Sequence, residues 1–340
     1  MPRSVSVAIV GAGQRGLQLA QWFARSERLH LAAVCDVDAE RCSAASARLG
    51  VPGETDHNRL LERGDVEAIL IATGARWHAP VAVDALRAGR HVYCEKPLAD
   101  SPAEARRMAD AAAAAGTVAV VGYQHRFSPF AALLAAEVPP LEPVQALLTA
   151  QRGTMNPQYF FPEAYGGIGD FITHTVDMAL WTMGGNPGGV TASVRRGTIL
   201  GDRTMEYLSL IVDFDGGERS ATLLSSMFGV RVPNLIEYVG ARGTLWTMDQ
   251  RTVRIARHDG VREAGNRPPD GLESREVACE AGGDTTGRSL DHFAALVAGD
   301  ADPGSPHACT FAEGADALGV GVAAALAAEQ GRRIALSELG

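Results

Sequence analysis

Short apolar runs alternate with alanine-rich helical patterns over the first 122 residues of this chain. Strands that alternate with helices form βαβ units, whose parallel strands are buried on both faces and are therefore continuously apolar. The predicted strands are Val5–Val10, Leu29–Cys35, Ala68–Ala72, His91–Cys94 and Val118–Gly122. The predicted helices are Leu17–Ser26, Ala39–Leu49, His78–Ala88 and Pro102–Ala115. The alternation predicts a doubly wound parallel sheet.

After Phe127 the pattern changes, because strand-like segments follow one another with few helices between them. Short turns such as Asp215-Gly216-Gly217 and Ala241-Arg242-Gly243 favour antiparallel pairing of these strands. The predicted strands are Val144–Gln151, Gly189–Ile199, Tyr207–Phe214, Ser220–Ser226, Leu235–Gly240, Gly243–Met248 and Thr252–Ile255. The predicted helices are Asp170–Met183, Ser289–Ala298 and Phe311–Gln330, and Gly260–Gly287 is expected to be a surface excursion.

A chain of 340 residues is long enough for two domains of about 100 to 200 residues each. We therefore predict an α/β protein in which residues 1–123 form the doubly wound domain. Residues 124–340 are expected to form an α+β domain with a large, mostly antiparallel open sheet.

Composition and charge narrow the class of partner. The net charge of −9 disfavours nucleic acid, because phosphate binding needs a basic face. No stretch reaches the roughly 18 uninterrupted apolar residues of a membrane span, and the N-terminus runs directly into a strand pattern, so we expect a cytoplasmic protein. Five scattered cysteines without a C-x-x-C pair indicate neither a disulfide framework nor a zinc site, and we predict no metal. A small molecule is the expected ligand.

The turn after the first predicted strand reads Gly11-Ala12-Gly13-Gln14-Arg15-Gly16. In this setting glycines permit a tight turn, a close approach of the backbone to a pyrophosphate, and close helix–strand packing. Asp36 ends the second strand, 20 residues past Gly16, where its carboxylate would bind the adenine ribose hydroxyls and repel a 2′-phosphate. These residues predict a dinucleotide site that favours NAD over NADP. The alternative is a tight turn and a solvated aspartate in a protein without a nucleotide.

Lys96 is the only lysine among 31 basic residues, and it lies in Glu95-Lys96-Pro97 directly after the fourth predicted strand. Lysine carries a compact ammonium whose pKa shifts readily, which arginine cannot replace in a tight site. The carboxyl edge of a doubly wound sheet is where ligands bind, so Lys96 is expected beside the nicotinamide. The alternative is compositional drift in an arginine-rich chain.

Ionisable side chains recur on one face of the first helix predicted after Phe127. Asp170, His174 and Asp177 follow i, i+4, i+7 spacing, which places them on one helical face. The alternative interpretation makes Asp170 a helix N-cap and His174 a hydrogen-bonded core histidine.

In motifs and in their order, the chain resembles the glucose–fructose oxidoreductase and inositol dehydrogenase family, also called Gfo/Idh/MocA. Members carry the glycine loop, a Glu-Lys-Pro after strand four, a Gly-aromatic-x-x-Arg-Phe segment and an Asp-x-x-x-His helix start. This chain supplies them at Gly11–Gly16, Glu95–Pro97, Gly122–Phe127 and Asp170–His174. The resemblance implies a Rossmann domain followed by a substrate-binding domain whose sheet forms dimers or tetramers.

The resemblance also implies roles for individual residues. Lys96, Asp170 and His174 would form the catalytic set, and it allows a cis peptide bond between Lys96 and Pro97. The cofactor would contact the glycine loop and further residues, namely Asp36, Thr73, His78, Glu95 and Lys96. The resemblance places Arg126 near the substrate, which would also contact the catalytic set. Arg152 and Tyr159 are expected to contact the substrate for a separate reason, because their side chains can form hydrogen bonds with sugar hydroxyls.

Alcohol oxidation sends a hydride to the nicotinamide while the hydroxyl proton goes to a base. His174 suits the base because histidine titrates near neutral pH, and Lys96 would stabilise a developing alkoxide by a charged hydrogen bond. Asp170 would hold a substrate hydroxyl. A nearby positive nicotinamide would lower the pKa of Lys96, so the roles of acid and base remain interchangeable between Lys96 and His174.

The chain departs from the family pattern in two places. Ile172 stands where a glycine is usual, and the common Thr-Pro-Asn-x-x-His loop reads Thr73-Gly74-Ala75-Arg76-Trp77-His78. Trp77 is expected to serve packing rather than recognition, because large aromatic side chains usually fill cores or interfaces. Further side chains with hydrogen-bonding groups suited to a polyol pocket are Gln124, His125, Arg152, Asn156 and Tyr159.

We predict an NAD(P)-dependent dehydrogenase or ketoreductase that acts on a secondary alcohol of a sugar, sugar derivative or cyclitol. One alternative retains NAD and uses transient oxidation to drive elimination or glycoside cleavage. Another is a regulator that binds NAD and a sugar without chemistry. The joint presence of Lys96, Asp170 and His174 argues against the regulator, which has no need of them.

Overall fold

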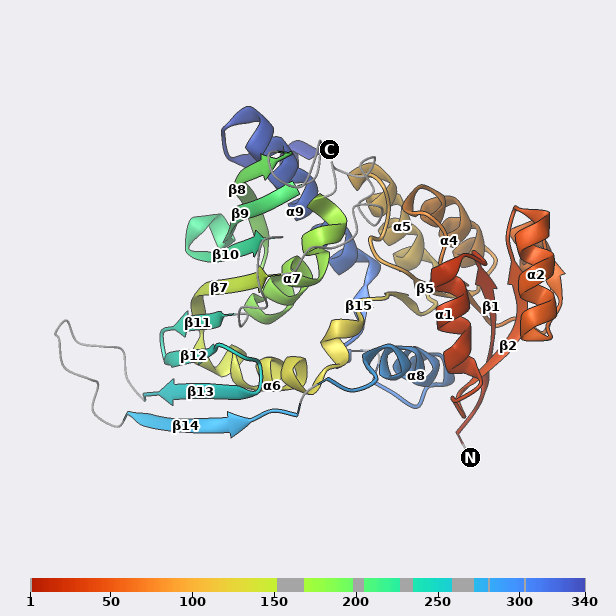
Figure 1. Cartoon of the computed structure of the whole chain (residues 1–340), viewed down its shortest axis with the longest axis horizontal. Coiled ribbons are helices and arrows are strands. Elements are labelled where there is room, and N and C mark those ends of the chain that lie inside the picture. The colour runs from red at the N-terminus through yellow and green to blue at the C-terminus, as the bar shows by residue number, and fades with distance from the viewer. Residues whose placement is uncertain are drawn as a thin grey trace. The chain divides into compact units, whose positions relative to one another are not determined.

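The computed structural model describes residues 2–151, 168–197, 205–226, 235–258, 272–280, 282–302 and 304–339. The chain divides into two compact units (Figure 1). The first contains Met1–Phe127 and Asp284–Leu318, and the second contains Ser128–Gly283 and Gly319–Gly340. This division differs from the expected single boundary after residue 123, because a C-terminal segment returns to the first unit.

The sheet of the first unit has seven strands in the order β15-β6-β5-β4-β1-β2-β3. All of its pairings are parallel except that of β15 with β6, which confirms the predicted doubly wound sheet. The strands are β1 (Val5–Val10), β2 (Leu29–Cys35), β3 (Gly53–Glu54), β4 (Ala68–Ile71), β5 (His91–Cys94), β6 (Ala119–Val121) and β15 (Cys309–Thr310).

Local signals set the ends of the helices between these strands. Asp38 caps α2 by accepting from the backbone N–H of Arg41, and Gly50 ends the helix in the left-handed conformation. Ser101 and Gly116 play the same two roles for α5. The helices are α1 (Gln14–Phe23), α2 (Ala39–Leu49), α3 (His57–Leu61), α4 (His78–Arg87), α5 (Pro102–Ala115) and α8 (Thr285–Ala298).

Helix α8 belongs to the core of the first unit, although it begins at Thr285 and the N-terminal part of that unit ends at Phe127. Leu290 and Phe293 are buried in the same cluster as Val7 and Ile9 of β1 and Leu19 of α1. The ring of Phe293 packs edge-on against Tyr93 of β5, with ring centroids 5.7 Å apart. The parallel sheet is therefore covered on one face by a helix from the far end of the chain.

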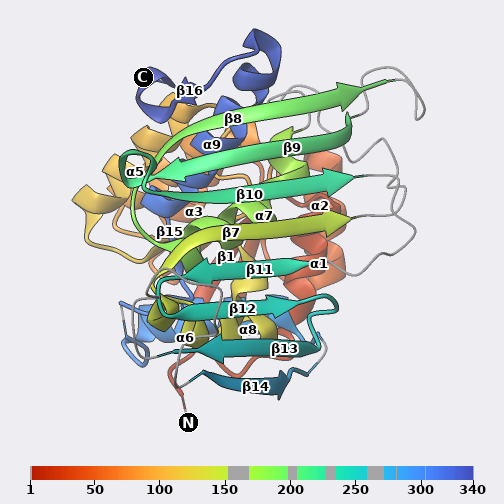
Figure 2. The ribbon, with the colours of Figure 1, turned by 90° about the vertical axis from the view of Figure 1, so that its left-hand side faces the viewer.

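The second unit contains a nine-stranded open sheet in the order β14-β13-β12-β11-β7-β10-β9-β8-β16 (Figure 2). Among the strands that the structure describes in this sheet, only the pairing of β7 with β10 is parallel, which confirms the predicted mostly antiparallel sheet. The strands are β7 (Pro143–Gln151), β8 (Pro187–Arg196), β9 (Met205–Phe214), β10 (Arg219–Ser226), β11 (Ile236–Gly240), β12 (Gly243–Thr247), β13 (Thr252–Arg257), β14 (Glu273–Ala278) and β16 (Ile334–Ala335).

Helix α7 (Ile168–Met183) packs on β7 and β10, and α6 (Pro129–Glu137) contacts α7. Helix α6 was not predicted from the sequence, although Ser128 caps it and Pro129 occupies its first turn. Strand β14 was also missed, because it lies inside the segment expected to be a surface excursion.

Helix α9 (Phe311–Gln330) is long and apolar enough to cross a membrane by length and composition. Within its most apolar window, 61% is buried inside the structure. A core helix of a globular protein has these properties, because burial on all sides selects apolar residues around the whole helix.

Candidate functional site

The turn between β1 and α1 is built so closely that two of its glycines admit no side chain. A Cβ on Gly11, which has φ +104°, would lie 2.7 Å from the carbonyl carbon of Ala72. A Cβ on Gly16 would lie 1.9 Å from the carbonyl oxygen of Gly11. A Cβ on Gly13 would meet nothing within 4 Å. The packing of the turn therefore requires glycine at positions 11 and 16. Gly13 instead leaves open space above the N-terminus of α1.

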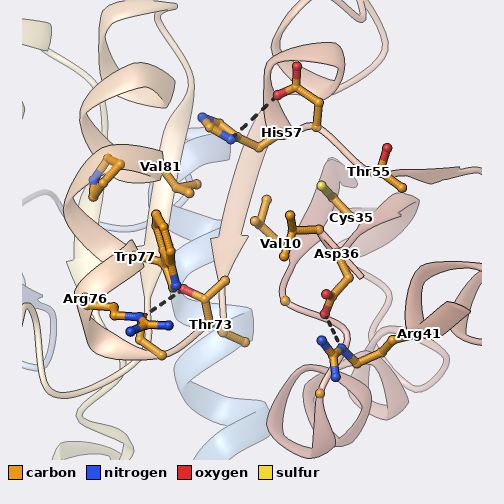
Figure 3. Close-up of a pocket in the computed structure, with 17 residues that line it drawn as sticks. Val10, Cys35, Asp36, Arg41, Thr55, His57, Thr73, Arg76, Trp77 and Val81 are labelled. Carbon is orange, nitrogen blue, oxygen red and sulfur yellow. Dashed lines mark hydrogen bonds and ion pairs between the residues drawn. The ribbon is translucent and has the colours of Figure 1, made fainter. Parts of the chain in front are cut away.

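A cavity of about 600 Å³ opens beside this turn, within the first unit (Figure 3). Its walls come from the glycine turn, the end of β2, the segment before α3, and the loop that leads from β4 into α4. Four of the residues predicted to bind the cofactor line this cavity, namely Gly11, Gly13, Asp36 and Thr73. The open side of Gly13 thus belongs to a space large enough for part of a dinucleotide.

Asp36 is a buried carboxylate at the edge of the cavity. Its Oδ2 accepts hydrogen bonds from the backbone N–H of Ala12 at 2.8 Å and from Nε of Arg41 at 2.9 Å. Its Oδ1 accepts from the backbone N–H of Asp38 at 3.0 Å. Burial raises the pKa of Asp36, but the hydrogen bonds from Arg41, Asp38 and Ala12 outweigh burial and hold the pKa below its usual value. The carboxylate stays charged and ties the glycine turn to the end of β2.

A second ion pair connects the first helix with the Glu-Lys-Pro segment. Nε of Arg15 donates to Oε1 of the buried Glu95 at 2.8 Å, and its terminal nitrogen lies 2.6 Å from the same oxygen. Lys96 follows in the loop after β5, and the peptide bond between Lys96 and Pro97 is cis. Gln14 is exposed in the first turn of α1. The arrangement brings the glycine turn and the lysine segment to the same edge of the parallel sheet.

His78 is only 1% exposed and does not line the cavity. Its Nδ1 lies 3.0 Å from the carbonyl oxygen of Pro97, and its Nε2 lies 3.1 Å from that of Thr73. Burial lowers the pKa of His78, against the opposing effect of these carbonyl oxygens. In place of the expected direct contact with a cofactor, His78 ties the loop after β4 to the loop after β5, and it thereby positions Thr73.

Trp77 was expected to serve packing, but the structure does not bury it in the core of the first unit. Its side chain is 53% exposed and lines the cavity. It ends the short 3-10 turn Ala75–Trp77 directly before α4, where the inward-facing positions are taken by His78 and Ala79. The guanidinium carbon of Arg76 lies 5.3 Å from the centroid of the Trp77 ring.

Arg126 lies in an environment unlike that expected of a substrate-binding residue. Its side chain is 1% exposed. Nη1 donates to Oε1 of Glu313 at 3.0 Å and to the carbonyl oxygen of Pro306 at 3.3 Å. His307 contacts the carbonyl oxygen of Arg126 through Nδ1. These contacts attach the segment before α9, and Glu313 in the first turn of α9, to the end of the N-terminal part of the first unit, which supports a structural role for Arg126.

Gln124 and His125 belong to the first unit, in the short 3-10 turn Gln124–Phe127, and the remaining predicted site residues belong to the second unit. Helix α7 begins at Ile168, so Asp170 lies inside the helix and is not its N-cap. His174 lies one turn further on and is buried, and Asp177 follows on the same helix and is also buried. Arg152, Asn156 and Tyr159 lie outside the described residues. The roles assigned to Asp170 and His174 remain predictions.

Several side chains that line the cavity were not singled out from the sequence as cofactor ligands, namely Val37, Arg41, His57 and Arg76. Val37 and Arg41 follow Asp36 closely in the sequence, so their short separation from the end of β2 could have identified them as cavity residues. His57 comes from α3, a helix of five residues that the periodicity did not reveal.

Comparisons with known proteins agree with this geometry. Residues 5–123 match the family described as "Oxidoreductase family, NAD-binding Rossmann fold", whose short name is GFO_IDH_MocA. Inositol 2-dehydrogenase 4 of Saccharopolyspora erythraea is 34% identical over 187 residues, which are 54% of this chain and 55% of that protein. This chain thus matches about half the length of that relative.

A glycosyl hydrolase family 109 protein of Shewanella is 33% identical over 118 residues, 32% of this chain and 26% of that protein. A levoglucosan dehydrogenase, solved in complex with NADH and levoglucosan, superimposes with a TM-score of 0.78 at 18% identity. That superposition covers 98% of this chain and 100% of the other, and at this identity it shows a shared fold.

Proposed function

Because residues 5–123 of this chain are an NAD-binding Rossmann domain of the Gfo/Idh/MocA oxidoreductase family, we propose that the protein is an NAD-dependent dehydrogenase or ketoreductase. Its proposed substrate is a secondary alcohol or ketone of a sugar, sugar derivative or cyclitol. The observation that carries the proposal is the cavity in which the open face of Gly13 and the carboxylate of Asp36 lie together. Backbone N–H groups at a helix N-terminus suit a pyrophosphate, and a carboxylate suits ribose hydroxyls.

The charge of Asp36 favours NAD over NADP, because a carboxylate repels a 2′-phosphate. Arg41 partly offsets this repulsion, since its Nε already bonds the carboxylate. Burial of Asp36 keeps the carboxylate close to the ribose position, whereas the guanidinium of Arg41 is half-exposed and screened by solvent. We therefore expect a preference for NAD that is moderate in size.

When bound, NAD supplies the acceptor for a hydride from the carbinol carbon of the substrate. We assign the proton chemistry to three residues of the chain. His174 takes the hydroxyl proton, Lys96 donates a charged hydrogen bond to the substrate oxygen, and Asp170 holds a neighbouring hydroxyl. In reduction of a ketone the proton moves in the opposite direction. The possible exchange of acid and base roles between Lys96 and His174 stays open.

A spectrophotometric screen tests this proposal. The purified protein is first checked for copurified cofactor, then mixed with sugars and cyclitols in the presence of NAD or NADP. We expect NADH to accumulate with at least one polyol, and Lys96→Ala to abolish turnover while NAD binding persists. Normal turnover by Lys96→Ala would refute the catalytic assignment, and a clear preference for NADP would refute the role given to Asp36.

A second candidate is a redox-assisted glycosidase or lyase that regenerates its own NAD. The similarity of 32% of this chain to a glycosyl hydrolase family 109 protein favours this candidate. The two functions differ in an observable product, because the glycosidase releases a sugar or alcohol without net formation of NADH. Chromatography of reaction products alongside the NADH absorbance distinguishes them.

We also propose that the nine-stranded sheet mediates homodimer or homotetramer formation. Three exposed apolar side chains of neighbouring strands lie on one face of this sheet, namely Tyr207, Ile211 and Leu224. Exposed apolar groups on a sheet face are typical of protein interfaces. Sedimentation of the wild type beside a variant with Ile211→Glu and Leu224→Glu tests this assignment, with a smaller particle expected for the variant.

A further inference from the structure

Two large apolar side chains of the first unit are exposed within the described residues, and both line the same cavity. Val37 is 87% exposed and Trp77 is 53% exposed. Leaving an indole in water forfeits a large hydrophobic stabilisation, since a tryptophan can bury 150 to 250 Å². Exposed apolar groups that gather in one concave site indicate a ligand with an apolar surface.

The local fold holds Trp77 at the cavity wall. The next residue, His78, is anchored by the carbonyl oxygens of Thr73 and Pro97, so the turn that carries Trp77 is fixed at both sides. The guanidinium of Arg76 lies over the indole and orients it by a cation–π contact. Figure 3 shows the indole between Val81 and Thr73, across the cavity from Val10 and Asp36. A preset aromatic surface loses little conformational entropy when a ligand binds.

The other walls of the cavity define what lies beside the indole. The open face of Gly13 suits a pyrophosphate, and the carboxylate of Asp36 suits the hydroxyls of the attached ribose. The group that follows the ribose in a dinucleotide is a purine base, which is planar and stacks well on an aromatic ring. Val37 directly follows Asp36 and offers an apolar contact at the same part of the cavity.

We propose that Trp77 is the stacking surface for the adenine base of the cofactor, with Val37 as a second apolar contact. This inference rests on the proposed function, because it assigns one wall of the same nucleotide site. In this assignment Trp77 contributes to affinity for the adenosine part of NAD and does not contact the nicotinamide part, which reacts. Trp77 therefore contributes to cofactor binding and not to the chemical step.

Calorimetric titration with fragments of the cofactor tests this assignment. ADP-ribose contains the adenine and NMN lacks it, and both are titrated into the wild type, Trp77→Ala and Trp77→Phe. Stacking of a base on an aromatic side chain is strong enough that we expect Trp77→Ala to bind ADP-ribose and NADH about tenfold more weakly. Trp77→Phe should retain most of the affinity, and the affinity for NMN should be unchanged in both variants.

Tryptophan fluorescence supplies a readout that does not depend on activity. We expect ADP-ribose to quench the emission of the wild type and of Trp22→Phe, and to leave that of Trp77→Phe nearly unchanged. Trp22 is the matched control because it lies on α1, outside the cavity lining, with Arg25 over its ring. Circular dichroism verifies that each variant is folded.

The outcomes separate the two proposals. If Trp77→Ala binds ADP-ribose as tightly as the wild type, the stacking role is refuted and the proposed function stands. The stacking role is also refuted if Trp77→Ala weakens the binding of ADP-ribose and of NMN by the same factor. The ratio of the two affinities would then equal that of the wild type. If the wild type binds neither ADP-ribose nor NADH, the proposed function fails and the role of Trp77 fails with it.

Discussion

At the scale of single residues, the glycine turn separates a structural requirement from a binding requirement. Gly13 and Gly16 belong to the same turn, but a Cβ meets open space at Gly13 and the carbonyl oxygen of Gly11 at Gly16. The conformation of Gly13, with φ −71° and ψ −173°, is open to any residue. The two glycines should therefore respond to alanine in different ways.

We predict that Gly13→Ala folds normally and loses affinity for NAD. The free energy of unfolding should change by less than about 0.5 kcal/mol, as for other substitutions without a clash. The new methyl group occupies the space of the pyrophosphate, so we expect the Kd for NAD to rise at least about tenfold. Chemical denaturation and calorimetric titration measure the two quantities.

Gly16→Ala is the matched comparison, and here the free energy of unfolding should fall by about 2 kcal/mol. Alanine gains about 1 kcal/mol over glycine in a helix, but overpacking against backbone costs more than that gain. The ordering would be contradicted if Gly16→Ala were as stable as Gly13→Ala.

Lys96→Arg tests whether a lysine is needed or only a positive charge. Arginine keeps the charge but presents a planar, wider group with different hydrogen-bond geometry. We expect turnover to fall at least about 100-fold, the size of effect seen when one donor to a developing oxyanion is lost. The Kd for NAD should change by less than about threefold. Near-normal rates would indicate that Lys96 is present by compositional drift and has no catalytic role.

At the scale of elements, regular patterns were predictable and irregular ones were not. The apolar runs of β1, β2, and β5 match their predicted bounds, because buried parallel strands are continuously apolar. Helix α6 was missed because its nine residues are nearly uniformly apolar and show no helical periodicity. Strand β14 was missed because its side chains are mostly exposed and half of them are charged, so the strand resembles the polar segment around it.

Helix α8 gives an element-scale prediction. If it is part of the first unit's core, Phe293→Ala should lower the free energy of unfolding by about 3–5 kcal/mol, the range for a buried phenylalanine. Val37→Ala is the control in the same unit, where an exposed side chain should change stability by less than about 0.5 kcal/mol. Urea denaturation without cofactor compares them. Equal effects would show that α8 packs more loosely than its contacts indicate.

At the scale of the whole molecule, three histidines contribute to the response of stability to mild acid. Burial lowers the pKa of His78, His91 and His292 below the usual value of about 6.5. The unfolded chain therefore binds more protons than the folded chain below about pH 6.5. Their contribution to stability is complete above that pH and is lost as the pH falls through the lowered values. Asp316, whose pKa burial raises, acts in the opposite direction at lower pH.

We predict that the urea midpoint is nearly constant between about pH 8 and pH 7 and declines between about pH 6.5 and pH 5. Nδ1 of His91 accepts a hydrogen bond from the backbone N–H of Val118, and protonation removes that acceptor. His91→Gln keeps an acceptor without titrating, so the decline should become shallower in this variant. A midpoint that rises on acidification would contradict the sign of all three shifts.

The sequence by itself determined the local pieces: the strand–glycine–helix unit, the acidic end of β2 and the antiparallel character of the second sheet. These depend on neighbouring residues, through side-chain period and turn chemistry. The tertiary structure alone decided that α8 covers the parallel sheet, that Arg126 is buried against Glu313 and that Trp77 faces a cavity. Burial and exposure depend on partners distant in sequence, whose approach no local pattern records.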